Sequence, residues 1–236
     1  MTQRFYSPRY DFAAQTPCYC NSGRAFGSCC GSTDHHREAP AGIQIVPDFI
    51  SRDEREDTLR FAEQQHRDWL LVAEINEANG QQTGWKRDPG RVTQYVDMAD
   101  RKPLMAEWML RAVQQHVQPR TGMAIERFEE PCMLRYTEGG LYGAHVDGEA
   151  FDETVGQWYR AIDRDISLLI YLNDDYAGGG LMFNNLNYTY QPRAGDLVFF
   201  PSNNIFRHES LTITSGIKYA LVTWSMAVGT PRVGTT

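Results

Sequence analysis

The sequence predicts an α+β protein with a mainly β core of the jelly-roll type, supporting helices before that core, and a small metal-binding module at the N-terminus. Three observations lead to this prediction. Strand-like segments follow one another from about residue 130 to residue 226, helical periodicity is confined to residues 41–125, and four of the five cysteines fall within thirteen residues. We therefore expect two units, a module with its linker at residues 1–40 and a larger domain at residues 41–236.

The β core is predicted from short apolar segments that Gly, Pro, Asn and Asp separate. Seven short strands in about 100 residues are typical of a closed or double-sheet β architecture such as a jelly roll. The predicted strands are residues 132–136, 143–147, 165–173, 180–184, 195–200, 205–210 and 216–226.

The region before the core is predicted to be mixed and partly helical. Residues 43–46 have the composition of a short strand. Ser51 and Glu54 have the spacing of a capping box and predict a helix that extends to about His66. A second helix is expected where Leu104, Trp108 and Ala112 recur at helical spacing.

Composition and charge exclude several classes of partner. The chain has 236 residues and a net charge of −7, which argues against nucleic-acid binding because such surfaces are normally basic. Apolar runs such as residues 168–170 are far too short to span a bilayer. The first residues lack the long apolar stretch of a signal peptide. We therefore expect a cytoplasmic protein without a nucleic-acid or membrane partner.

A candidate metal site begins at His145-Val146-Asp147. Residues two apart on a strand point to the same face, so the imidazole and the carboxylate can converge on one ion. His208 lies on a later predicted strand. Two histidines and one carboxylate leave open positions on iron, as in non-haem Fe(II) oxygenases. The H-x-D pair alone is weak evidence, because any strand can carry it.

A lysine on the last predicted strand strengthens this interpretation. Lys218, Ala220, Val222 and Trp224 share one strand face by their period of two. A lysine among apolar neighbours is costly unless its charge is paired, and a bound dicarboxylate would pair it. The alternative is an exposed lysine at a strand edge, where lysines are usually found.

These residues carry a resemblance to a known family. The segment Tyr136-x-x-Gly139-x-x-Tyr142-x-x-His145-x-Asp147 resembles the iron-site entry of prolyl 4-hydroxylase-like 2-oxoglutarate oxygenases. The family's later motifs follow in order over about residues 130–226, namely Arg164-x-x-Ser167-x-Leu169-x-Tyr171-Leu172-Asn173, Gly178-Gly179, Phe183, Pro192-x-x-Gly195-Asp196 and Arg207-His208-Glu209. The sequence departs from the family at Gly180 and Leu181, where Glu and Thr are common.

The resemblance implies a double-stranded β-helix with iron held by His145, Asp147 and His208. It implies that Lys218 binds the distal carboxylate of 2-oxoglutarate, with Tyr136 and Ser167 beside that co-substrate. It further implies that 2-oxoglutarate is oxidatively decarboxylated to succinate and CO2 while an unactivated C–H bond is hydroxylated. Ascorbate is a candidate reductant.

The substrate is expected to be a peptidyl proline or a related amino-acid residue. Candidate contacts come from aromatic rings and from arginines whose forks suit a carboxylate. These residues are Tyr142, Trp158, Tyr159 and Trp224, with Arg87, Arg91 and Arg164. Residues 148–163 are expected to form a lid, with a well-packed loop as the alternative. Three alternatives remain: a hydroxylase of a free amino acid or small metabolite, a non-catalytic metal-binding interaction protein, and a cupin-like module without 2-oxoglutarate.

The cysteine cluster predicts a second metal. Cys18-x-Cys20-x-Ser22-Gly23-x5-Cys29-Cys30-Gly31 resembles the SEC-C zinc-binding motif at its metal positions. Four thiolates in a compact loop suit tetrahedral zinc. His35 or His36 is an alternative fourth ligand. The module would either dock a protein partner or only stabilise the N-terminus.

Overall fold

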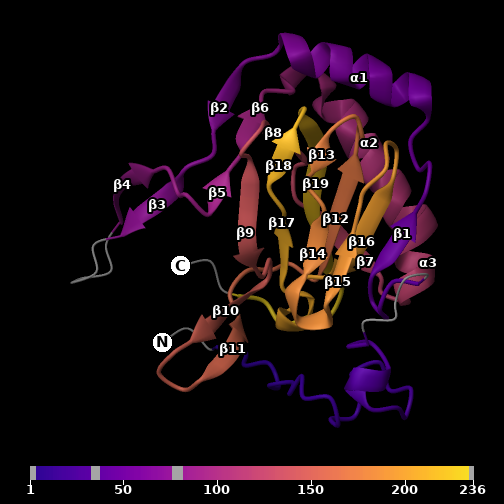
Figure 1. Cartoon of the computed structure of the whole chain (residues 1–236), viewed down its shortest axis with the longest axis vertical. Helices are drawn as coiled ribbons and strands as arrows, with labels where there is room; N and C mark the ends of the chain where they lie inside the picture. Colours follow the sequence, from indigo (N-terminus) through magenta and orange to yellow (C-terminus); the bar gives the residue numbers. More distant parts are fainter. Residues whose placement is uncertain (1–3, 33–37, 76–81, 234–236) are drawn as a thin grey trace.

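The computed structural model describes residues 4–32, 38–75 and 82–233, and its centre is a pair of antiparallel sheets (Figure 1). The larger sheet has the order β1 (Gln44–Val46), β16 (Leu197–Pro201), β12 (Ile166–Tyr171), β19 (Lys218–Ala227), β8 (Cys132–Tyr136), β6 (Gln94–Val96) and β2 (Arg67–Trp69), with β7 (Ile125–Phe128) also paired to β19. The smaller sheet has the order β15 (Tyr188–Tyr190), β14 (Leu181–Phe183), β17 (His208–Ser210), β9 (Leu141–His145) and β5 (Arg91–Val92). The predicted double-stranded β-helix with N-terminal helices is confirmed.

Three strand pairs lie outside these sheets. They are β3 (Val72–Ile75) with β4 (Gln82–Lys86), β10 (Glu149–Asp152) with β11 (Gln157–Arg160), and β13 (Ala177–Gly178) with β18 (Ile213–Ser215). The β3–β4 and β10–β11 hairpins project from the same side of the sheets in Figure 1. The β10–β11 hairpin occupies the segment for which the sequence predicts a lid.

Both predicted helices form. In α1 (Arg52–Gln64) the Ser51 hydroxyl accepts a hydrogen bond from the Glu54 amide, and the Glu54 carboxylate accepts one from the Ser51 amide, so the capping box is confirmed. Helix α2 (Lys102–Ala112) continues through a π-helical turn, η3 (Val113–Val117), into α3 (Gln118–Thr121). Gly122 ends this run in the left-handed conformation, at a φ of 70°. No helix within the described ranges is long and apolar enough to cross a membrane.

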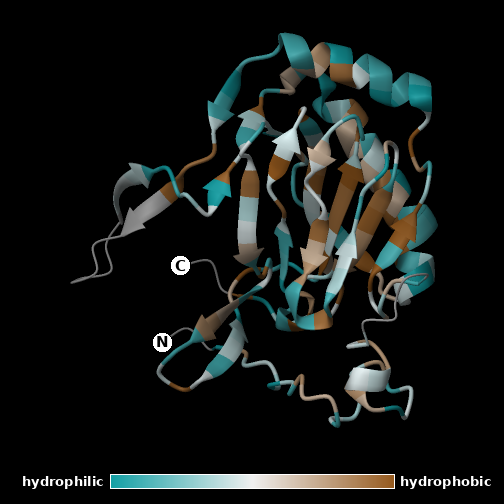
Figure 2. Ribbon diagram, viewed as in Figure 1, coloured by the Kyte–Doolittle hydropathy of each residue, from teal (hydrophilic) through white to brown (hydrophobic). Residues whose placement is uncertain are grey.

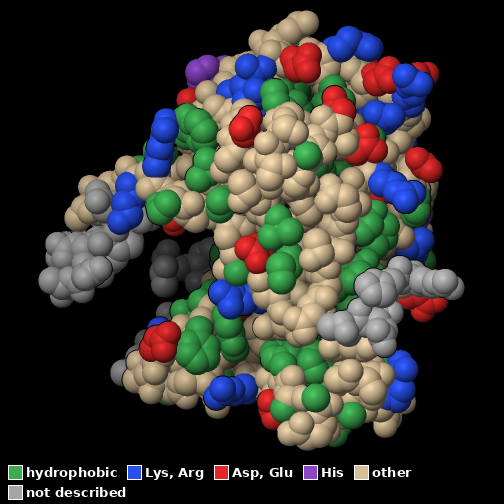
Figure 3. Space-filling model, viewed as in Figure 1, with side chains coloured by type: hydrophobic (Ala, Val, Ile, Leu, Met, Phe, Trp, Pro, Cys, Tyr) green, Lys and Arg blue, Asp and Glu red, His purple; other side chains and the backbone are tan. Residues whose placement is uncertain are grey.

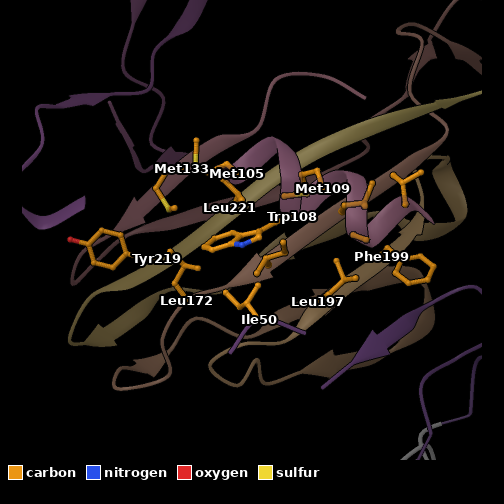
Figure 4. Close-up of a cluster of buried hydrophobic side chains, with 14 of the residues drawn as sticks. Ile50, Met105, Trp108, Met109, Met133, Leu172, Leu197, Phe199, Tyr219 and Leu221 are labelled. Atoms are coloured by element: carbon orange, nitrogen blue, oxygen red, sulfur yellow. The ribbon is translucent and has the colours of Figure 1, made fainter. Parts of the chain in front are cut away.

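Successive side chains on the strands of the larger sheet point to opposite faces, and each face contributes to a separate hydrophobic core. On β16, Leu197 and Phe199 pack with α2 residues such as Trp108, whereas Val198 and Phe200 pack with residues of the smaller sheet. Figure 4 shows the helix-side core, in which Trp108 lies among methionine and leucine side chains. The central strands are correspondingly the most hydrophobic part of the ribbon in Figure 2, and α1 is mostly hydrophilic. The inner core between the sheets surrounds the site described below.

The N-terminal residues pack against this barrel rather than extending from it. Cys18, Cys29 and Cys30 belong to the same apolar cluster as Phe200 and Phe206. Residues 5–7 run beside β11, where the Arg160 amide donates to the Phe5 carbonyl at 2.9 Å. The apolar cluster is therefore continuous across residue 40. The division into domains at that residue remains a prediction.

Candidate metal and co-substrate site

The two histidines and the aspartate of the predicted site lie together at one end of the smaller sheet. His145 ends β9, His208 begins β17, and the two are directly opposite each other in the antiparallel pair. Nε2 of His145 lies 3.4 Å from Oδ1 of Asp147, and Nε2 of His208 lies 3.6 Å from Oδ2. One ligand atom from each of the three residues lies within 4.8 Å of the others. This spacing suits a single ion.

Asp147 lies beyond the end of β9 and not on the strand predicted for it. The predicted strand over residues 143–147 is wrong at its end, because β9 stops at His145 and Asp147 lies in the following turn. The Gly148 amide donates to the Ser202 carbonyl at 2.8 Å, which anchors that turn. A Cβ at residue 148 would lie 2.6 Å from the Arg164 carbonyl oxygen, so the backbone approaches too closely for a side chain.

Hydrogen bonds orient each ligand side chain. Nδ1 of His145 lies 2.9 Å from the Gly143 carbonyl, and Nδ1 of His208 lies 3.0 Å from the Phe206 carbonyl. A carbonyl acceptor at Nδ1 places the proton there and leaves Nε2 free to bind a metal. The Ser167 hydroxyl donates to Oδ2 of Asp147 at 2.6 Å. Ser167 thus holds the carboxylate, although it also lines the cavity where the co-substrate is expected.

The charge states match a metal site. Burial lowers the pKa of His208 to about 4, so its imidazole is neutral near pH 7, as a metal ligand must be. Burial alone would raise the pKa of Asp147, but attraction to His208 and a hydrogen bond with His145 outweigh it and hold that pKa well below its usual range. Two histidines and a carboxylate are the donor set typical of mononuclear Fe(II).

Lys218 is buried in the same cavity without a carboxylate partner among the described residues. Its Nζ donates to the Gly179 carbonyl at 2.9 Å and to the Ser210 hydroxyl, and it lies 4.5 Å from the centre of the Tyr136 ring. The side chain is only 2% exposed, and burial lowers its pKa to about 7. A buried cation of this kind is costly unless an anion joins it, so Lys218 fits the distal carboxylate of 2-oxoglutarate.

A cavity of about 410 Å³ joins the histidines to Lys218. Lys218, Ala220, Val222 and Trp224 all line it, which confirms that the four share one strand face. The surface is hollowed between the β3–β4 and β10–β11 hairpins in Figure 3, on the side of the barrel where β9 lies in Figure 1.

Most other side chains predicted for the site also line this cavity, namely Tyr136, Tyr142, Arg164 and Ser167. Trp158 does not line it, and its ring packs edge-on against Phe151 on the β10–β11 hairpin at 5.4 Å. Sequence reasoning missed Ser202 and Ser210. Ser210 could have been found from its position two residues after His208, on the same strand face. Ser202, which contacts Ser167 at 2.8 Å, carries no sequence signal.

Comparison with known proteins matches this geometry to a family. Residues 132–226 match the family model described as the 2OG-Fe(II) oxygenase superfamily. The core domain is a prolyl 4-hydroxylase-like 2-oxoglutarate- and Fe(II)-dependent oxygenase domain, and this similarity implies Fe(II) and 2-oxoglutarate as cofactor and co-substrate.

Similar sequences and structures extend beyond the core. The chain is 28% identical over 192 residues to a PKHD-type hydroxylase of Psychrobacter, covering 77% of this chain and 68% of that protein. It is 31% identical over 120 residues to the PKHD-type hydroxylase YbiX of Escherichia coli, covering 49% of this chain and about half, 51%, of the relative. A viral collagen prolyl hydroxylase from Paramecium bursaria Chlorella virus-1 has a similar fold, with a TM-score of 0.54 at 16% identity, covering 79% of this chain and 97% of that one.

The four cysteines outside the oxygenase core also converge. Their sulfur atoms all lie within 4.8 Å of one another, and none forms a disulfide. A tetrahedral zinc site with Zn–S bonds of about 2.3 Å has S···S separations of about 3.8 Å, close to this spacing. A hydrogen bond from the Ser22 hydroxyl lowers the pKa of Cys20 to about 6 and also lowers that of Cys29, whereas burial raises the pKa of Cys18 and raises that of Cys30 to about 12. The predicted alternatives His35 and His36 lie outside the described residues.

The cysteine module lies behind a ligand of the oxygenase site. The Tyr19 ring packs edge-on against Phe206 at 5.9 Å, and its hydroxyl donates to the Ala41 carbonyl at 2.8 Å. Phe206 supplies the carbonyl that orients His208, and Phe200 packs against the His208 ring at 4.7 Å. The module therefore forms part of the wall that supports His208.

Proposed function

We propose that this chain hydroxylates a peptidyl proline, or a related amino-acid residue of a peptide, with Fe(II) and 2-oxoglutarate. The observation that carries the proposal is the juxtaposition of two incomplete sites in one cavity. The ligand triad needs a metal, and the buried Lys218 needs an anion. Iron with a chelating 2-oxo dicarboxylate would satisfy both.

The residues around the cavity have distinct roles in this proposal. His145, Asp147 and His208 would hold Fe(II), and Lys218 with the Ser210 hydroxyl would hold the distal carboxylate. When bound together, Fe(II) and 2-oxoglutarate supply an oxidation by O2 in which 2-oxoglutarate becomes succinate and CO2 and a substrate C–H becomes C–OH.

The walls of the cavity would determine which carbon is oxidised. The Tyr142 ring stacks on the His145 ring at 3.8 Å with only 13° between their planes. On the other side, Trp224 carries the Arg164 guanidinium over its ring at 3.6 Å. These stacked rings and the guanidinium group would contact the substrate beside the proposed iron site and exclude water from it.

Two solved structures with this fold support a peptide substrate. One is the viral collagen prolyl hydroxylase, and the other is a prolyl hydroxylase from Trichoplax adhaerens in complex with a hypoxia-inducible-factor peptide fragment. The second has a TM-score of 0.54 at 17% identity, covering 78% of this chain and 83% of that chain. A protein with this fold can therefore bind a peptide.

The test is an assay of short proline-containing peptides beside free proline, lysine and arginine, with Fe(II) and 2-oxoglutarate. Mass spectrometry should show the gain of one oxygen in a peptide, with one succinate formed for each oxygen incorporated. The His145→Ala variant is the control that should give neither product. Oxygen incorporated only into a free amino acid would contradict the peptide substrate while leaving the oxygenase chemistry intact.

We further propose that Cys18, Cys20, Cys29 and Cys30 bind one structural zinc ion. The spacing of the four sulfur atoms supports this proposal. The packing of the module against Phe206 favours stabilisation of the barrel as its role. Binding of a protein partner through the module remains a prediction from the sequence.

A further inference from the structure

The sequence suggests Arg87, Arg91 and Arg164 as candidates to bind a substrate carboxylate. They differ in whether they line the cavity and in whether their charge is paired. Arg164 lines the cavity, but Glu129 accepts two hydrogen bonds from it, at 2.6 and 2.7 Å, and so neutralises its charge. Arg87 lies over the Trp69 ring at 4.6 Å and does not line the cavity. Arg91 lines the cavity, and the ion pairs among the described residues do not include it.

Arg91 is held close to the proposed iron site by aromatic stacking. It is the cross-strand partner of Tyr142, and its guanidinium lies 4.7 Å from the centre of that ring. The Tyr142 ring also stacks on the His145 imidazole, with 3.8 Å between the two ring centres. One aromatic ring therefore separates the cation from a proposed iron ligand.

The Arg91 guanidinium forms no hydrogen bond with the part of the chain that the structure describes. Its Nε is buried and has no partner there. The nearest acidic residue along the chain, Asp88, directs Oδ1 to the Gly90 amide at 2.7 Å, which closes the turn before β5. A guanidinium with five donors presents a planar fork that matches a carboxylate.

Charge balance indicates what this fork would bind. In the proposed loaded site, Fe(II) and Lys218 bring three positive charges, and Asp147 and the dicarboxylate bring three negative charges. The Arg164–Glu129 pair is neutral by itself. Asp88 is close in sequence, but one of its carboxylate oxygens is bound by the Gly90 amide and it forms no ion pair with Arg91. A carboxylate of the substrate would give Arg91 the ion-pair partner that it lacks among the described residues.

We propose that Arg91 binds a carboxylate of the substrate and selects substrates that carry one beside the hydroxylated carbon. This inference rests on the proposed function, because it assigns a substrate feature to the same cavity. The carboxylate can belong to an Asp or Glu side chain next to the target residue, to the end of a peptide, or to a free amino acid.

The test uses three pairs of ligands in which a carboxylate is exchanged for the uncharged amide. The pairs are a proline peptide with an adjacent Glu or Gln, a peptide ending in proline or in prolinamide, and free proline or prolinamide. Binding is measured under nitrogen with Fe(II) and 2-oxoglutarate present, and kcat/KM is measured in air. Binding without O2 keeps a failure of hydroxylation separate from a failure of carboxylate recognition.

We expect the wild-type protein to prefer the carboxylate of one pair by about 10- to 100-fold, as for a hydrogen bond between charged groups. The pair that shows the preference identifies the source of the carboxylate. Arg91→Gln should reduce this ratio to near one, and Arg91→Lys should restore part of it. Arg87→Gln is the matched control outside the cavity and should keep the wild-type ratio.

Two results would overturn the proposal. One is the absence of any carboxylate preference in the wild-type protein, or a preference that Arg91→Gln leaves unchanged. The other is a loss of 2-oxoglutarate affinity in Arg91→Gln as large as the loss of substrate affinity, because that would place Arg91 in the co-substrate site. A thermal melt of each variant shows whether the fold is retained.

Discussion

The triad around Asp147 and the four cysteine thiols near the N-terminus are held in place by different means. The triad joins residues 145–147 to residue 208 through the β9–β17 pair, and backbone carbonyls and Ser167 orient each side chain. The thiols come from thirteen consecutive residues whose only regular element is the short 3-10 helix η1 (Phe26–Ser28). The first cluster is held by strand pairing, whereas the second lies in a loop that the proposed zinc ion would help to hold.

This difference predicts whether each cluster keeps its structure when its metal ion is absent. A ligand set that strands and buried hydrogen bonds preorganise should survive without its ion, since the sheets and their two cores hold it. The cysteine loop has little regular structure, so a bound zinc would supply much of its local folding free energy, in addition to the packing of Tyr19 and Phe26. The following predictions test this contrast, beginning with the largest expected effect.

Loss of zinc should unfold the N-terminal module and leave the barrel folded, with a lower melting temperature because the module packs against Phe206. Structural zinc contributes about 10 kcal/mol or more in zinc-finger peptides, far more than a loop of this size gains from packing. Cys29→Ser should abolish the zinc content of about one ion per chain, measured by elemental analysis, and expose residues 4–32 to proteolysis. Cys132→Ser removes the cysteine outside the cluster and should keep the zinc. Wild-type protein purified without chelators and lacking zinc would refute the assignment.

Loss of an iron ligand should abolish activity without unfolding any part of the protein. His145→Ala and His208→Gln should abolish succinate formation, because neither leaves a complete triad. The melting temperature should change little, since His145 is partly exposed and glutamine fills much of the space of His208. His66→Ala is a control at an exposed histidine far from the site. Turnover of 2-oxoglutarate by either variant at the wild-type rate would show that the ligand assignment is wrong.

Lys218 should make co-substrate binding depend on pH. Its pKa in the free protein is about 7, and a bound dicarboxylate would keep it protonated, so binding takes up a proton above pH 7. The affinity for 2-oxoglutarate should therefore fall as pH rises, by up to about tenfold per pH unit. Calorimetry in buffers of different ionisation enthalpy measures both the affinity and the proton uptake.

The matched variant for this prediction is Lys218→Met, which keeps the length of the side chain and removes its charge. It should lose about 2–5 kcal/mol of binding free energy, as for truncation of one member of a buried charged pair. The pH dependence should disappear with it, while metal binding stays close to wild type. A wild-type affinity for 2-oxoglutarate in Lys218→Met would exclude the role.

Ser167→Ala should have the smallest effect, because it removes an orienting hydrogen bond and no ligand. Loss of such a partner typically weakens metal binding by about 10- to 100-fold. Ser202→Ala is the matched control, since its hydroxyl contacts Ser167 and is not bonded to Asp147. Titration with Fe(II) under nitrogen should therefore give the order wild type, Ser202→Ala, Ser167→Ala. Equal affinities in all three proteins would show that the turn alone fixes Asp147.

The local sequence determined the elements of this protein and the identity of the reactive side chains. The capping box at Ser51 and Glu54, the helical spacing before Ala112 and the alternation along residues 218–224 each follow from interactions between residues close in sequence. The spacing of the four cysteines is equally local, which is why the cluster could be predicted without the fold.

Only the tertiary structure decided how these side chains are oriented and which of their charges are paired. Asp147 does not follow the strand periodicity expected of it, because contacts with Ser167 and Ser202, far along the chain, fix its turn. The sequence could not distinguish Arg91 from Arg164, because the neutralising Glu129 lies 35 residues away from Arg164 along the chain. Nor could it place the cysteine module behind His208. Such contacts depend on which distant residues the sheets bring together, and no local pattern encodes that pairing.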